Sequence, residues 1–357
     1  MNVSQMRSFS AMVAALVLGV SSASAADLDT VYRPGDTKGF AGQMTGVTRT
    51  DVTITQKVGN KEEKIPANEI ARIEFQGEPP TLNLARSNEN AGRLADAMAG
   101  YQEALGATSN DNVKAEINFL MARTLAKMAQ ADPSKAAAAI EKLNSLANSS
   151  RDHYRFYPSQ LLLGETALLI HDHVTAQTAF DRVQQAPWND YKMISKNGLA
   201  RTLIDQKKPD EAKPLFDSVA SAKGTTPTEK AAILEAMLGQ AECLQAKGQG
   251  PQAAEILQKV VAEATAADHR ILAQAYLQLG SIYSADSQKN KEALLAYLHV
   301  DVIPSLAAES DLHAEALYNL AKLWPSVGQP GRGAEASAKL QSDYPSSEWT
   351  KKLGEGE

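Results

Sequence analysis

A three-residue pattern recurs seven times along this chain of 357 residues, and it constrains the fold more than any other feature. In the clearest copy, Ala176 is followed four residues later by Phe180 and three residues after that by Val183. This spacing places a small, a bulky and an aliphatic side chain on one face of a helix. The copies begin at Ala97, Ala136, Ala176, Ala212, Ala253, Ala293 and, in a weaker form, Gly333.

The copies are evenly spaced, since their first residues lie 36 to 41 residues apart. Self-similarity at such a period is typical of a solenoid, in which each repeat is one supersecondary unit. A single unit cannot bury its own apolar face, so we expect stability to come from the stacking of neighbours.

A second marker precedes each copy and predicts a second helix in every repeat. Leu163-Gly164, Leu238-Gly239 and Leu279-Gly280 are Leu-Gly pairs, and in three further copies alanine replaces the glycine. In the remaining copy the pair is Leu120-Met121. Small residues on both helices allow the helix axes to approach within ~8–10 Å.

Together these markers resemble the tetratricopeptide repeat (TPR), with its Leu-Gly-x-x-Tyr and Ala-x-x-x-Phe patterns. The resemblance is clearest over residues 160–188 and extends over about residues 81–345. The period near forty exceeds the 34 residues usual for the family, so we expect longer loops or helix ends. The resemblance implies a mainly α protein, a right-handed α-solenoid of about seven helix pairs.

A small all-β module is expected before the solenoid, over residues 26–77. Residues 52–58 alternate apolar and β-branched with polar side chains, and Gly59-Asn60 is a hairpin signal. Residues 40–47, 61–65 and 70–75 are the other strand candidates. Four or five short strands suggest a half-open barrel or curled sheet, and their order resembles an SH3- or Sm-like barrel. Its role stays open between a cap on the solenoid and a ligand-binding module.

The ends of the chain are interpreted separately. Residues 1–25 have the pattern of a secretory signal, with Arg7, an apolar run over residues 11–20 and small residues after it. We expect cleavage after Ala25 or Ala26, and a periplasmic, extracellular or cell-envelope location. The alternative is a retained anchor, but ten helical residues rise only ~15 Å against ~30 Å of hydrocarbon. We expect the solenoid to span residues 78–345, and residues 346–357 to form a C-terminal cap or tail.

Composition and motifs argue against several functions. The chain has 36 basic and 42 acidic residues and no basic stretch, which argues against a nucleic-acid partner. The single cysteine, Cys243, excludes an intrachain disulfide and is interpreted as a packing residue. His171-Asp172-His173 is interpreted as a solvated turn, and His313 lacks the cysteine pair that a zinc deaminase would need. We therefore expect no enzyme activity, cofactor or metal.

The resemblance to TPR proteins also implies a concave groove lined by the first helix of each pair. Carrying the register over predicts nine groove residues: Leu161, Glu165, Asn197, Arg201, Gln240, Leu277, Ser281, Tyr318 and Lys322. The expected function is a non-catalytic scaffold or adaptor that binds a protein or peptide in this groove outside the cytoplasm. The alternative is a cell-envelope protein whose β module holds a polysaccharide or peptide, with the solenoid as a spacer.

Overall fold

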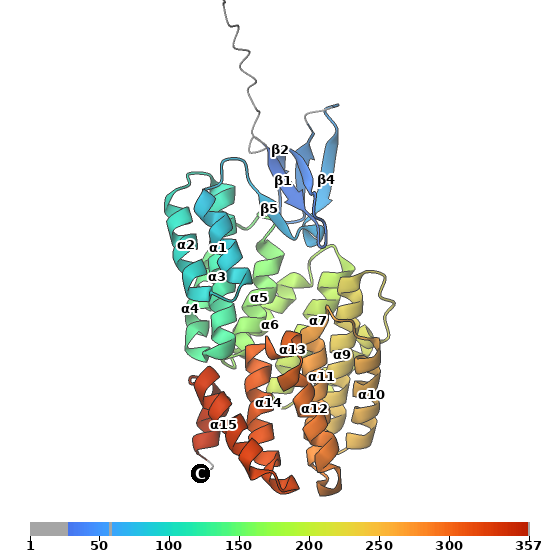
Figure 1. Ribbon diagram of the computed structural model, residues 1–357. Helices are drawn as coiled ribbons and strands as arrows, with labels where there is room; N and C mark the ends of the chain where they lie inside the picture. Colours follow the sequence, from blue (N-terminus) through green and yellow to red (C-terminus); the bar gives the residue numbers. More distant parts are fainter. Residues whose placement is uncertain (1–27, 57–58, 356–357) are drawn as a thin grey trace, which may run out of the picture.

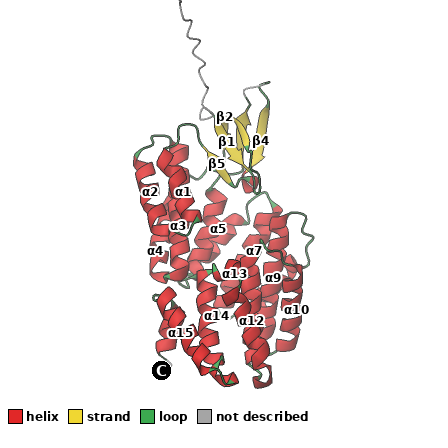
Figure 2. Cartoon of the chain, viewed as in Figure 1, coloured by secondary structure: helices red, strands yellow, loops and turns green. Residues whose placement is uncertain are grey.

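The computed structural model describes residues 28–56 and 59–355 as a small β-sheet at one end of a curved array of helices (Figure 1, Figure 2). The predicted signal, with both expected cleavage sites, lies outside the described residues. Among the described helices, none is both long and apolar enough to cross a membrane.

The sheet is antiparallel and has the strand order β4-β3-β2-β1-β5. Its strands are β1 (Asp29–Tyr32), β2 (Phe40–Val47), β3 (Asp51–Thr55), β4 (Glu62–Pro66) and β5 (Arg72–Glu74). A flat sheet of this order would separate β4 from β5 by four strand spacings, ~19 Å. Only five residues join them, and three of these form a compact 3-10 turn, Ala67–Glu69. The sheet must therefore curl, as the sequence predicted.

The helices form seven antiparallel pairs, as expected for the repeat array. The pairs are α1 (Pro80–Asn90) with α2 (Leu94–Gly106), α3 (Asp111–Ala131) with α4 (Ala136–Ser149), α5 (Phe156–Leu168) with α6 (His173–Val183), α7 (Asn189–Asp205) with α8 (Pro209–Ala220), α9 (Pro227–Ala246) with α10 (Gly250–Glu263), α11 (His269–Ser284) with α12 (Asn290–Val302), and α14 (Ser310–Leu323) with α15 (Pro330–Asp343). Two short helices, α13 (Pro304–Ala307) and α16 (Glu348–Gly354), complete the array. Long first helices, 21 residues in α3 and 20 in α9, help to explain the long period.

The recurring triplets all lie on the second helices, and their small first residues are buried. The Phe180 ring of α6 shows why small residues are needed opposite it. A Cβ atom added at Gly164 of α5 would lie 2.6 Å from the Phe180 Cζ, and one at Gly198 of α7 would lie 2.5 Å from it. One ring therefore fills the space between its own pair and the next.

The β module is continuous with the first repeats. Val31, Ile73 and Phe75 of the module belong to the same buried apolar cluster as Leu82 of α1 and Ile117 of α3. This shared core fits the interpretation of the module as a cap on the solenoid.

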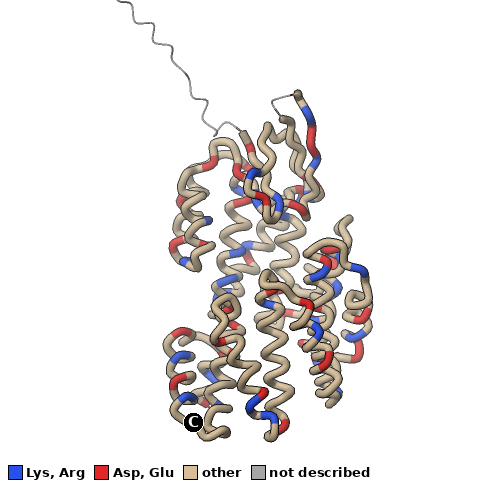
Figure 3. The backbone as a smooth tube through the Cα atoms, turned by 45° about the vertical axis from the view of Figure 1, so that its right-hand side comes forward, with Lys and Arg blue, Asp and Glu red and all other residues tan. Residues whose placement is uncertain are grey.

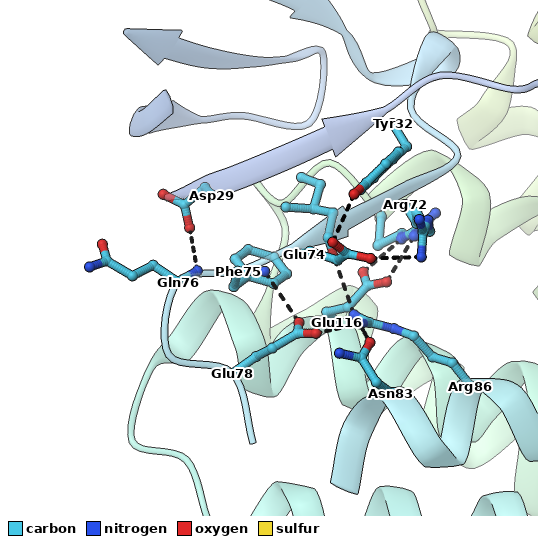
Figure 4. A network of polar contacts seen from close by, with 12 residues as sticks. Asp29, Tyr32, Arg72, Glu74, Phe75, Gln76, Glu78, Asn83, Arg86 and Glu116 are labelled. Atoms are coloured by element: carbon cyan, nitrogen blue, oxygen red, sulfur yellow. Dashed lines mark hydrogen bonds and ion pairs between the residues drawn. The ribbon is translucent and has the colours of Figure 1, made fainter. Parts of the chain in front are cut away.

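Polar contacts reinforce this junction (Figure 4). Arg86 of α1 donates from Nη2 to the Ile73 carbonyl oxygen (3.1 Å) and forms an ion pair with Glu78 (2.7 Å). Arg155 donates from Nη2 to the Ala71 carbonyl oxygen (3.2 Å) and binds both carboxylate oxygens of Glu116 at 2.8 Å. The two arginines thus fix the last strand of the module to the helices.

The array curves far enough for distant pairs to meet. Helix α14 of the seventh pair contacts α3 of the second pair, although nearly two hundred residues separate them in the sequence. The first helices of the intervening pairs therefore surround a hollow.

Candidate binding groove

Two adjoining cavities lie on the inner side of the array, against the first helices of successive pairs. The first has a volume of about 310 Å³ and is lined from α3, α5, α7, α9 and α11, with Phe180 from α6. The second has a volume of about 260 Å³ and is lined from α7, α9, α11 and α14. Arg201 and Gln274 line both cavities, so the two form one groove.

The structure places five of the nine predicted groove residues in the lining. Glu165 and Asn197 line the first cavity, Leu277 and Ser281 line the second, and Arg201 lies between them. Their role in binding stays a prediction. Their convergence follows from the repeat register, which places the same face of each first helix on the inner side.

The other four predicted residues do not line either cavity. Leu161 is half-buried and packs against the cluster around Phe180. Gln240 donates from Nε2 to Asp217 Oδ1 (2.8 Å) and thus contacts α8. Tyr318 packs against Trp349 of α16, with ring centroids 5.2 Å apart, and its hydroxyl lies 3.2 Å from Lys322 Nζ.

Sequence reasoning missed most of the charged lining. Glu235 and Glu242 lie seven residues apart on α9, and Arg270, Gln274 and Gln278 lie four apart on α11. Such spacing keeps side chains on one helix face. On α11, moving one or two helical turns from the predicted Leu277 and Ser281 reaches all three of its residues. On α9 this would have failed, because Glu235 and Glu242 lie five residues before and two residues after the predicted Gln240.

The lining is rich in carboxyl groups. Glu165 and Glu235 belong to the first cavity, and Glu242 and Glu315 to the second. The guanidinium groups of the lining belong to Arg201 and Arg270. Over the described residues as a whole, by contrast, acidic and basic residues are interspersed (Figure 3).

The two arginines differ in their partners. Arg270 is held by Glu309 (2.8 Å) and by both oxygens of Asp311 (2.9 and 2.6 Å). Arg201 forms no ion pair within 4.0 Å among the described residues. Arg201 is therefore the guanidinium of the groove without an ion-pair partner among the described residues, and its charge acts to lower the pKa of Glu165.

The hollow changes the acidity of these carboxyl groups. Desolvation raises the pKa of Glu165 to about 7, and the negative charge of Glu235 adds to the increase. Desolvation also raises the pKa of Glu315 to about 7, with the charges of Asp311 and Glu348 acting in the same direction. At neutral pH these two carboxyl groups are therefore partly protonated, unlike an ordinary glutamate.

Two amide oxygens in the lining lack hydrogen-bond partners within the described part of the chain. Asn197 is 1% exposed and donates from Nδ2 to the Ala232 carbonyl oxygen (2.7 Å), while its Oδ1 is unpartnered. Oε1 of Gln278, in the wall of the second cavity, is likewise buried without a hydrogen-bond partner among the described residues. Both are acceptors, so a ligand that donates hydrogen bonds would suit the groove.

A histidine cluster outside the groove could in principle hold a metal ion. In the predicted turn, His171 Nδ1 and His173 Nε2 lie 2.8 and 2.6 Å from Oδ2 of Asp205, which α7 contributes from the next pair. Imidazole nitrogens and a carboxylate oxygen are typical zinc ligands. In this structure the three side chains interact with one another, and His171 is exposed as predicted.

Cys243 and His313, the other two residues considered for a chemical role, make contacts that are typical of structural residues. Cys243 is fully buried, and burial raises the pKa of its thiol to about 11. His313 is buried between Asp301 Oδ1 (2.9 Å) and Tyr344 Oη (2.7 Å), so it connects α14 to α12 and to the residue that follows α15. Neither side chain lines the groove cavities.

Comparison with known proteins identifies the repeat. The tetratricopeptide-repeat family model matches residues 235–264, which comprise most of α9 and α10. The helical array is a TPR fold. The predicted resemblance, the α-solenoid of helix pairs and the preceding β module are thus confirmed.

A solved structure supports the TPR fold. A tetratricopeptide repeat protein from Parabacteroides merdae is 14% identical, with a TM-score of 0.51 over 76% of this chain and 95% of that chain. PilW, a type IV pilus biogenesis factor, is 17% identical, with a TM-score of 0.43 over 69% of this chain and 99% of that chain. Only the first of these two similarities is strong enough to support an argument about the fold. A comparison with curated protein sequences gives no match.

Proposed function

We propose that this protein is a non-catalytic scaffold or adaptor that binds a protein or peptide partner in the groove of its TPR solenoid, outside the cytoplasm. The observation that carries the proposal is the pair of adjoining cavities on the inner faces of successive first helices. The signal-like pattern of residues 1–25 supports the location.

The chemistry of the lining supports binding over structural packing. The buried core consists mainly of apolar side chains between helices, whereas the groove is lined by carboxyl groups, amides and the Arg201 guanidinium. Side chains that the stacked core does not need are available for a partner. Polar groups placed in a concave, partly apolar surface are typical of binding sites.

Site-specific photo-crosslinking tests the proposal in the producing cell. A crosslinking residue at Gln274 reports on the groove, and one at Gln252, exposed on α10, reports on the outer face. We expect position 274 to capture a specific protein that position 252 does not capture.

The captured partner is then purified and its affinity measured. We expect Gln274→Trp to block the groove and weaken binding at least tenfold, about 1.4 kcal/mol, while Gln252→Trp has no effect. Circular dichroism confirms that both variants are folded. Unchanged affinity of a folded Gln274→Trp protein would refute the groove as the binding site.

The β module provides the alternative. Its β2–β4 strands project away from the helices (Figure 1), and along β3 and β4 buried residues alternate with more exposed ones. If the partner binds the Gln274→Trp variant normally and crosslinks instead from β4, the module holds the ligand and the solenoid is a spacer.

A further inference from the structure

We propose that the groove selects a cationic partner: a peptide segment whose lysine or arginine side chains enter the first cavity between Glu165, Glu235 and the amide oxygen of Asn197. This inference rests on the proposed function, because it names the chemistry of the ligand for the same groove.

The first observation is the charge of the lining. Four glutamates line the two cavities, two in each, and Arg201 is the guanidinium that faces them without an ion-pair partner among the described residues. The charge of Arg270 is already neutralised by Glu309 and Asp311. Charge complementarity therefore favours a positively charged ligand and disfavours an anionic one.

The second observation is independent of charge. Among the residues that the structure describes, Oδ1 of Asn197 is buried and unpartnered in the wall of the first cavity, and Oε1 of Gln278 is unpartnered in the wall of the second. A buried acceptor without a partner is rare and costly in a native protein. Ammonium and guanidinium groups are donors without acceptors, so they complement these oxygens, whereas a carboxylate ligand offers no donor.

The acidity of the groove gives supporting evidence. Glu165 is partly protonated at neutral pH because desolvation and Glu235 raise its pKa, against the lowering effect of Arg201 and Arg270. The positive charge of a bound ligand would strongly lower the pKa of Glu165. Binding near pH 7 should therefore release protons from the groove.

The probes are two labelled nonapeptides, one alternating alanine with lysine and one alternating alanine with glutamate. Fluorescence anisotropy with the purified full chain at pH 7 measures their affinity. We expect the lysine peptide to bind, with an affinity that falls as salt is added, and the glutamate peptide not to bind. Preferential binding of the glutamate peptide would overturn the inference.

Matched variants separate the groove from general attraction to an acidic protein. We expect Glu165→Gln to weaken binding of the lysine peptide about tenfold and Arg201→Gln to strengthen it, because one change removes attraction and the other removes repulsion. Glu255→Gln, on the exposed face of α10, removes the same charge outside the groove and should leave binding unchanged. Equal weakening by Glu165→Gln and Glu255→Gln would show diffuse attraction and overturn the inference.

Calorimetry in two buffers of different ionisation enthalpy gives a second readout. We expect proton release when the lysine peptide binds the unmodified protein, and reduced release for Glu165→Gln. If the photo-crosslinked partner binds in the groove but its affinity falls with Arg201→Gln and not with Glu165→Gln, the proposed function stands and the cationic ligand is wrong. If Gln274→Trp leaves that partner bound, the proposed function itself fails.

Discussion

Replacing Gly164 with alanine tests the close helix packing on which the repeat register depends. The added Cβ would lie 2.6, 2.7 and 2.9 Å from the Cζ, Cε1 and Cε2 atoms of Phe180. Non-bonded carbon atoms prefer ~3.5–4.0 Å, so the shortest contact is about 0.9 Å too close. The ring cannot simply move toward α7, because Gly198 approaches it with the same closeness from that side.

The expected free-energy change combines two opposing effects. Overpacking a well-filled core costs ~1–3 kcal/mol, and the trapped ring places this site near the upper value. Alanine improves helix propensity by ~1 kcal/mol relative to glycine. We therefore expect Gly164→Ala to lower the free energy of unfolding by about 2 kcal/mol, measured as a lower urea midpoint by circular dichroism.

Two comparisons make this prediction specific. Gly106→Ala, at the exposed end of α2, has no heavy atom within 4 Å of the new Cβ and should leave stability unchanged or slightly higher. A Phe180→Leu background lacks the ring atoms. In that background the loss of unfolding free energy caused by Gly164→Ala should be at least ~1 kcal/mol smaller than in the unmodified protein. If Gly164→Ala instead behaves like Gly106→Ala, or if its cost persists without the ring, the packing argument is refuted.

Three further predictions concern other parts of the chain. Burial acts to raise the pKa values of Glu89 and Glu116, but ion pairs and hydrogen bonds with Arg123 and Arg155, respectively, lower both pKa values to about 2. Each carboxylate therefore contributes stability above its unfolded pKa near 4.5 and loses that contribution as the pH falls toward 2. Urea midpoints should fall steeply between pH 4.5 and pH 2, and less so in a Glu89→Gln variant. The Cys243 thiol is buried with a raised pKa, so alkylation by iodoacetamide at pH 8, followed by mass spectrometry, should be slow in the native protein and fast in urea. N-terminal sequencing of the exported protein should begin at residue 26 or 27, whereas an intact N-terminus would favour an anchor.

The sequence predicted the helical array well because small residues must recur wherever two helices cross. All seven triplets lie on second helices, and the Gly164 and Phe180 register is the one observed. Strand β1 was not singled out, since four residues give too short an alternation. Its pairing with both β2 and β5 comes from tertiary context.

The groove was predicted only in part, for a different physical reason. Helical spacing fixes where a side chain leaves the backbone, but not where its far end binds. Gln240 was predicted to line the groove, yet its amide reaches Asp217 on the outer helix. The approach of Asp205 to the histidine turn likewise depends on how successive pairs stack, which a single repeat does not encode.

The contact between α14 and α3 has a consequence for how the protein unfolds. In an open repeat array each unit interacts only with its neighbours, so the last repeats can fray at the cost of one interface. Here the seventh pair is bound both to the sixth pair and to the second, and its opening must break both interfaces. The array thereby gains a long-range contact, and we expect its seventh pair to fray less readily than the last pair of an open array.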